Sequence, residues 1–122
     1  MTSNKQRDPA EQILQQFLNE LGFAEQPEMA HTAQRFTKLL RDYANVDLPP
    51  VSVFDVKTTG LVTLKNIPFY SLCAHHLMPF FGTAVIEYTP NERVAGLGGI
   101  TKTVQHLAKK PTLQEALAEE IA

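Results

Sequence analysis

The spacing of apolar residues predicts two helices in the first third of the chain. The first is expected to begin after Asp8, because an acidic cap followed by Pro9 and Glu11 is a typical helix start. Gly22 is placed to end it. A second amphipathic stretch follows, and the prolines at 49–50 close the helical part because proline has no amide N–H to donate. The apolar positions with helical spacing are Ile13, Leu14, Phe17, Leu18 and Leu21 in the first helix and Met29, Ala33, Phe36, Leu40 and Tyr43 in the second.

After residue 50 the pattern changes to one that suits β-strands. Residues 51–67 are rich in Val, Thr, Phe, Leu and Ile, with Thr59-Gly60 as a candidate turn or bulge. A second strand is predicted at 80–88 and is ended by turn-forming residues at 89–92. Residues 71–79 are therefore expected to connect the two strands.

Two more helices are predicted in the last third of the chain, one around residues 100–108 and one opened by residues 111–115. In the second of these helices, apolar residues still recur at helical spacing up to Ala122, and the residues that usually end a helix are missing. Only about two long strands precede it, and a two-stranded ribbon is marginal alone. We therefore expect another chain to complete the sheet, or the natural protein to continue beyond this sequence.

Composition narrows the class of protein. The 122 residues carry 11 Lys+Arg against 13 Asp+Glu, a net charge of −2, so no basic surface for nucleic acid is expected. A single cysteine excludes an internal disulfide, and a cytoplasmic setting is the default. The polar start and the lack of a long apolar run give no sign of a signal peptide or a membrane partner.

The residues best suited to chemistry are Cys73 and His76, a Cys-x-x-His pair with His75 inside it. In a turn, residues three apart project to the same side, so a thiolate and an imidazole could hold one zinc ion. Two ligands do not complete a site, because a catalytic zinc typically has three protein ligands. A buried thiol followed by two hydrogen-bonded histidines is the alternative, and the pair by itself does not decide between them.

The wider context resembles the GTP cyclohydrolase I family. Residues 67–82 read IPFYSLCAHHLMPFFG, similar to the family's F-x-S-x-C-E-H-H-x-x-P-F-x-G. The segments YTP at 88–90, VAGL at 94–97 and KPTLQE at 110–115 follow in the family's order and spacing, and HTAQR at 31–35 resembles its T-P-x-R helix start. The resemblance covers the chain from about residue 29 to its end and is strongest between residues 67 and 115.

This resemblance implies roles for individual residues. Cys73 and His76 match the family's zinc ligands, and His75 matches the histidine that transfers protons beside the metal. Zinc lowers the pKa of its bound water to about 7, which provides hydroxide to attack C8 of the purine. Gln114 and Glu115 match residues near the purine. The family's third zinc ligand is a cysteine downstream of these helices, and this sequence ends at Ala122 before any such position.

The resemblance also implies an α+β tunnelling fold, with an N-terminal helical segment at 1–50, a partial catalytic domain at 51–122 and the last strands missing. It implies a homo-oligomeric ring that hydrolyses GTP to formate and 7,8-dihydroneopterin triphosphate for folate or pterin synthesis. Glu115 has a second reading, since Thr112-x-x-Glu115 is also a capping box.

Four positions depart from the family pattern. Ala74 replaces a glutamate, Gly98 and Gly99 replace Ser-Lys, and Lys102 stands where arginine is common, in the segment that contacts the substrate triphosphate in the family. Loss of bidentate phosphate contacts leaves open a different purine or pterin substrate. Ala74 and the missing ligand leave open a non-catalytic binding or regulatory relative.

Overall fold

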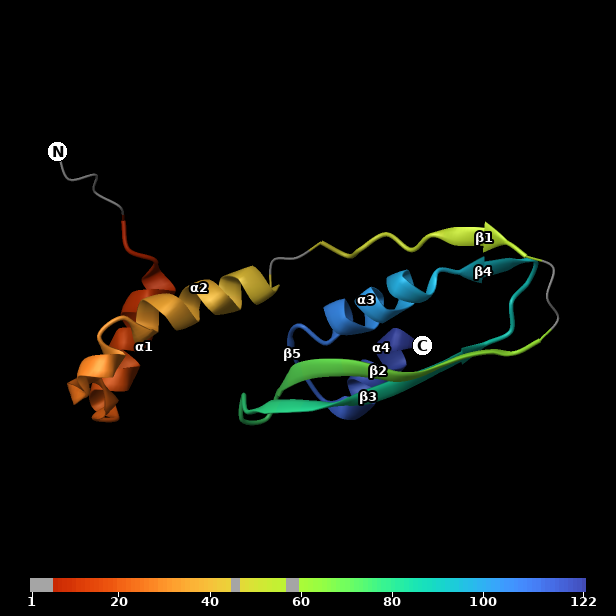
Figure 1. Ribbon diagram of the computed structural model, residues 1–122. Helices are drawn as coiled ribbons and strands as arrows, with labels where there is room; N and C mark the ends of the chain where they lie inside the picture. Colours follow the sequence, from red (N-terminus) through yellow and green to blue (C-terminus); the bar gives the residue numbers. More distant parts are fainter. Residues whose placement is uncertain (1–5, 45–46, 57–59) are drawn as a thin grey trace. The chain divides into compact units, whose positions relative to one another are not determined.

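The computed structural model describes residues 6–44, 47–56 and 60–122, in two compact units, 1–45 and 46–122. The elements in chain order are α1 (Pro9–Glu20), η1 (Phe23–Glu25), η2 (Pro27–Met29), α2 (Thr32–Ala44), β1 (Val53–Asp55), β2 (Val62–Cys73), β3 (Pro79–Tyr88), β4 (Arg93–Ala95), α3 (Leu97–Leu107), β5 (Pro111–Thr112) and α4 (Gln114–Ile121) (Figure 1).

The first unit is a pair of helices joined by two short 3₁₀ turns. The predicted start and end of α1 are confirmed, because Pro9 is its first residue and Gly22 adopts a left-handed conformation with φ 78° just after it. The second helix begins later than the apolar pattern suggested, since Met29 lies in η2. Ala33 and Thr37 are the buried residues of α2, whereas Phe36 is exposed.

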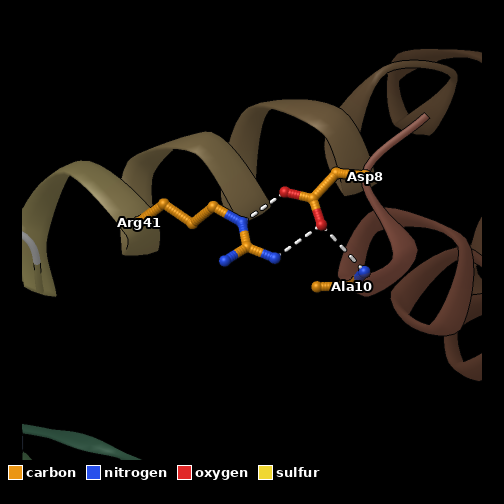
Figure 2. A network of polar contacts seen from close by, with 3 residues as sticks. All are labelled: Asp8, Ala10 and Arg41. Atoms are coloured by element: carbon orange, nitrogen blue, oxygen red, sulfur yellow. Dashed lines mark hydrogen bonds and ion pairs between the residues drawn. The ribbon is translucent and has the colours of Figure 1, made fainter. Parts of the chain in front are cut away.

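Asp8 links the two helices of this unit at their ends. One carboxylate oxygen accepts the backbone N–H of Ala10 at 2.9 Å, which caps α1. The same carboxylate accepts two hydrogen bonds from the guanidinium of Arg41 on α2, the one from Nη2 at 2.6 Å (Figure 2). The hydrogen bond from Arg41 holds the pKa of Asp8 below its ordinary value. The cap predicted from the sequence therefore also ties α1 to α2.

The second unit is built around the β2–β3 hairpin. These strands pair antiparallel from Val62↔Tyr88 to Leu72↔Pro79, with a bulge at Asn66, whose φ is 58°. β5 adds to the other side of β2 in parallel, and β1 pairs with β4 in a separate two-stranded ribbon. Helix α3 packs against β2 and against α4 (Figure 1).

The two faces of the hairpin have different surroundings. The buried residues of this unit are Ile67 and Ser71 from β2, Pro90 after β3, Thr112 from β5, Val104 and Ala108 from α3 and its end, and Leu117 from α4. Tyr70 and Phe81 stand opposite each other in the register, with ring centroids 6.0 Å apart, and are 71% and 78% exposed. One face thus meets the helices, and the other presents aromatic side chains.

The α+β class predicted from the sequence is confirmed, and the arrangement agrees with part of a tunnelling-fold subunit. The strand predicted at 51–67 is wrong as one strand, because β1 and β2 are separate elements; the candidate turn at Thr59 lies outside the described residues. The connection predicted at 71–79 is shorter, since β2 continues to Cys73. No helix among the described residues is long and apolar enough to cross a membrane.

Candidate functional site

The turn between β2 and β3 carries three of the predicted site residues. Cys73 is the last residue of β2, and His75 and His76 lie in the turn that follows. Two backbone bonds close this turn: the Cys73 N–H donates to the Met78 carbonyl at 2.9 Å, and the Leu77 N–H donates to the Cys73 carbonyl at 2.7 Å. Leu77 has a φ of 60°, a strained conformation for a leucine that the two bonds maintain.

The turn leaves its imidazoles open to solvent and its thiol partly covered. His75 and His76 are exposed, and Cys73 is half-buried with no disulfide. Nδ1 of His76 accepts the backbone N–H of Met78 at 3.1 Å. In the neutral imidazole this bond places the proton on Nε2. To bind a metal through Nε2, His76 would have to lose the bond from Met78 and carry its proton on Nδ1 instead.

A short parallel bridge joins this turn to the start of α4. The register pairs Leu72 with Pro111 and Cys73 with Thr112, and the Ala74 N–H donates to the Thr112 carbonyl at 3.0 Å. Two residues beyond Thr112, α4 begins at Gln114. The bridge therefore connects the Cys-x-x-His turn to the segment that leads directly into Gln114 and Glu115, which lie about 40 residues later in the sequence.

The local reading of Glu115 as half of a capping box is wrong. Helix α4 begins at Gln114 with Leu113 at its cap position and no capping bond from a side chain. The Thr112 hydroxyl instead donates to the Leu113 carbonyl at 3.3 Å, and Thr112 is buried between β2 and α4. Gln114 and Glu115 are both exposed in the first turn of α4. The glutamate is therefore not used as a helix cap.

The described residues do not by themselves make a complete zinc site. Cys73 and His76 are donors of the right chemistry on one turn, yet the described part of the chain contains no group of three His, Cys, Asp or Glu side chains able to hold a metal. The residues present therefore fit only part of a zinc coordination shell, and at least one more ligand would have to come from elsewhere.

Lys102 and the two glycines lie on α3. Lys102 is exposed in the middle of that helix. Gly98 and Gly99 fall in the first turn of α3, not before it as a loop. A Cβ at Gly99 would lie 3.0 Å from Cα of Val51 and 3.4 Å from the Pro50 carbonyl, whereas a Cβ at Gly98 would meet nothing within 4 Å.

Sequence reasoning missed the residues that connect these segments. Ser71, buried on β2, donates its hydroxyl hydrogen bond to the Lys110 carbonyl at 3.2 Å. The Lys110 ammonium pairs with Glu120 on α4 at 2.5 Å. The sequence signals for Ser71 were its match to the serine of the F-x-S-x-C pattern and its position two residues before Cys73, on the same side of a strand.

Comparison with known proteins gives a consistent family. A sequence model described as GTP cyclohydrolase I matches residues 10–122. The chain is 40% identical over 100 residues to GTP cyclohydrolase 1 of Fusobacterium nucleatum, covering 78% of this chain and 54% of that protein. It is 53% identical over 85 residues to the Hydrogenobaculum sp. protein of the same name, covering 70% of this chain and 40% of the relative.

A third relative, GTP cyclohydrolase 1 of Streptococcus agalactiae, is 36% identical across 95% of this chain and 66% of its own length. The matched part of the chain thus spans between 40% and 66% of the length of these relatives.

Proposed function

Because the chain belongs to the GTP cyclohydrolase I family, we propose that it supplies part of the active site of an enzyme that opens the imidazole ring of guanine in GTP. A first water adds at C8 and the C8–N9 bond breaks, which leaves C8 as a formamide on N7. A second water hydrolyses this formamide, so the C8–N7 bond breaks and C8 leaves as formate. The opened intermediate then rearranges at the ribose and closes, with loss of one water, to 7,8-dihydroneopterin triphosphate. The product assigns the protein to pterin or folate synthesis in the cytoplasm.

The observation that supports this proposal is the β2–β5 bridge, which joins two segments that the sequence separates. One segment carries His75, and the other leads into Gln114 and Glu115. An imidazole can both donate and accept a proton, so the exposed His75 is suited to transfer a proton to or from a ring nitrogen as the ring opens. Glu115 is suited to accept hydrogen bonds from the N–H groups of guanine, and Gln114 can add a further polar contact beside it.

Lys102 is the proposed phosphate contact. It is an exposed ammonium in α3, a helix of the same unit as the turn and α4. An ammonium binds phosphate as a point charge and lacks the bidentate geometry of a guanidinium. We therefore assign Lys102 a modest share of the affinity for the triphosphate.

The proposed metal is zinc, with Cys73 and His76 as two of its ligands. The described residues hold no group of three candidate ligands, so in this proposal the remaining ligand is supplied from outside them, for example by another copy of the chain. A ligand shared between copies of the chain would require a homo-oligomer. The exposed aromatic face of the β2–β3 hairpin offers apolar area for contacts between such copies. The zinc content is measured on the same preparations as the activity.

A second candidate is a family member whose substrate is a purine or pterin without the triphosphate. Gly98 and Gly99 favour it, because glycine has no side chain to contact a phosphate, and a Cβ at position 99 would lie 3.0 Å from Cα of Val51. Comparing turnover of GTP with turnover of guanosine separates the two candidates. A strong preference for GTP would exclude the second.

The decisive experiment measures formate and dihydroneopterin triphosphate released from GTP by the purified, zinc-loaded protein. His75→Ala is expected to lower formate release by about 10²- to 10⁴-fold, the usual contribution of a general acid or base. His31→Ala is the matched control, because His31 is an exposed histidine outside the proposed site. Equal activity of the two variants, or no formate from the unaltered protein, would refute the proposal.

Zinc analysis of the same preparations tests the ligands. Cys73→Ser is expected to lower the zinc content to below half of that in the unaltered protein while His31→Ala leaves it unchanged. The Glu115→Gln variant is expected to raise KM for GTP, since an amide cannot accept two hydrogen bonds in the way a carboxylate does. An unchanged KM would remove Glu115 from the purine contact.

A further inference from the structure

The buried hydroxyl of Ser71 joins the inner face of the hairpin to the segment that leads into β5. Ser71 is 2% exposed, and its Oγ lies 3.2 Å from the Lys110 carbonyl oxygen. A hydroxyl buried without a partner costs free energy, so a buried serine on a strand is tolerated where it has a specific acceptor. Here the acceptor belongs to a segment 39 residues away in the sequence.

The segment that accepts this bond pairs with β2 over only two residues. β5 consists of only Pro111 and Thr112, and parallel pairing is less stable per residue than antiparallel pairing. Proline has no N–H, so position 111 cannot donate to β2. The Ala74 N–H to Thr112 carbonyl bond fixes one end of the bridge, and the Ser71 hydroxyl fixes the other end.

Lys110 contacts both Ser71 and helix α4. Its carbonyl accepts the Ser71 bond, and its ammonium pairs with Glu120 at 2.5 Å in the last turn of α4. Leu117, 3% exposed, anchors the middle of the same helix in the core. A shift of the chain at residue 110 would therefore move the start of α4 relative to the turn that carries His75.

We propose that Ser71 is a positioning residue: its hydroxyl fixes the β2–β5 bridge and thereby sets the placement of Glu115 relative to His75. The inference rests on the proposed function, because those two residues are its purine contact and its proton-transfer group. Ser71 acts only through the Lys110 carbonyl and need not touch substrate.

Three variants of the full chain test this role. Ser71→Ala removes the hydroxyl, and Ser71→Thr keeps it on a side chain that suits a strand. Tyr88→Phe is the matched control, because the Tyr88 hydroxyl also ties the hairpin to another segment, accepting the Ala95 N–H at 3.1 Å. The control lies at the opposite end of the β2–β3 ladder from the turn, since Tyr88 pairs with Val62.

Steady-state kinetics of formate release give the first readout. We expect Ser71→Ala to lower kcat by roughly 10- to 100-fold, as displaced catalytic groups do, with KM for GTP changed less than about threefold because the purine contact itself is retained. Ser71→Thr is expected to restore most of kcat. A kcat for Ser71→Ala within about twofold of that of Tyr88→Phe would overturn the proposal. It would also be overturned if Ser71→Ala and Tyr88→Phe lost activity equally because both unfold.

Amide hydrogen exchange gives a second readout that needs no activity. The Ala74 amide, which donates to Thr112, is expected to exchange about tenfold faster in Ser71→Ala than in Tyr88→Phe. Equal Ala74 exchange in the two variants would overturn the proposal. If the unaltered protein releases no formate, the proposed function fails while exchange at Ala74 still decides whether Ser71 fixes the bridge.

Discussion

Adjacent glycines at the start of α3 are expected to respond oppositely to the same substitution. Alanine is favoured over glycine inside a helix by up to about 1 kcal/mol, and both positions lie in the first turn of α3. At Gly98 the added methyl group meets nothing within 4 Å. Gly98→Ala is therefore expected to stabilise the protein by a few tenths to about 1 kcal/mol.

At Gly99 the added methyl group would lie 3.0 Å from Cα of Val51 and 3.3 Å from its Cγ1. Because the closest atom belongs to the backbone, no side-chain rotation can relieve the contact. Such overpacking costs about 1–3 kcal/mol, which offsets or exceeds the gain in helix propensity. Gly99→Ala is therefore expected to be less stable than Gly98→Ala by about 1–3 kcal/mol.

The assay is thermal and urea denaturation of both variants followed by circular dichroism at 222 nm. A difference of 1 kcal/mol corresponds to about 4 °C or more in Tm for a unit of this size. The Gly99→Ala protein should therefore melt several degrees below the Gly98→Ala protein, with the unaltered protein between them. A Gly99→Ala protein that melts at or above Gly98→Ala would refute the close packing of α3 on Val51.

Three further predictions concern other parts of the chain. The hydrogen bond from Arg41 lowers the pKa of Asp8 below 3.8, so the pair stabilises the first unit above that pH, and the stabilisation disappears as pH falls through the lowered pKa. Arg41→Gln should make Asp8 titrate at higher pH in an NMR titration, and identical curves would contradict this. Leu117→Ala, at a site 3% exposed, should lose about 2–5 kcal/mol in urea denaturation, whereas Leu97→Ala, 63% exposed, should change stability little; equal losses would contradict the assigned core. Glu92 has a φ of 65°, so Glu92→Gly should raise the free energy of unfolding by about 1 kcal/mol, and a lower urea midpoint for this variant would disprove the strain.

Local signals in the sequence were sufficient to predict that the helices and the β3 strand form. The cap at Asp8 and the left-handed residue at Gly22 bound α1, because both features depend on side chains within a few residues of the helix ends. The pattern at 80–88 predicted β3 to within one residue. Apolar spacing was less reliable for Met29, which a 3₁₀ turn separates from α2.

For the candidate site, the sequence identified residue types and family resemblance but not their connections. The Cys-x-x-His spacing indicated zinc chemistry, and the motif order pointed to the family that the comparisons support. The same local reasoning assigned Thr112 to a helix cap, whereas in the structure Thr112 pairs with Cys73 in the parallel β2–β5 bridge. A capping box and a two-residue parallel strand share the same short sequence, and only contacts with β2 distinguish them.

The sequence by itself therefore determined what depends on near neighbours: helix starts and ends, the long hairpin strands and the donors on the turn. The tertiary structure decided what depends on segments distant along the chain. Ser71 meets Lys110 across 39 residues, and Gly99 meets Val51 across a separate ribbon. Closing such loops costs chain entropy that no local pattern records, so these contacts form only where the packed core of β2, α3 and α4 compensates for that cost.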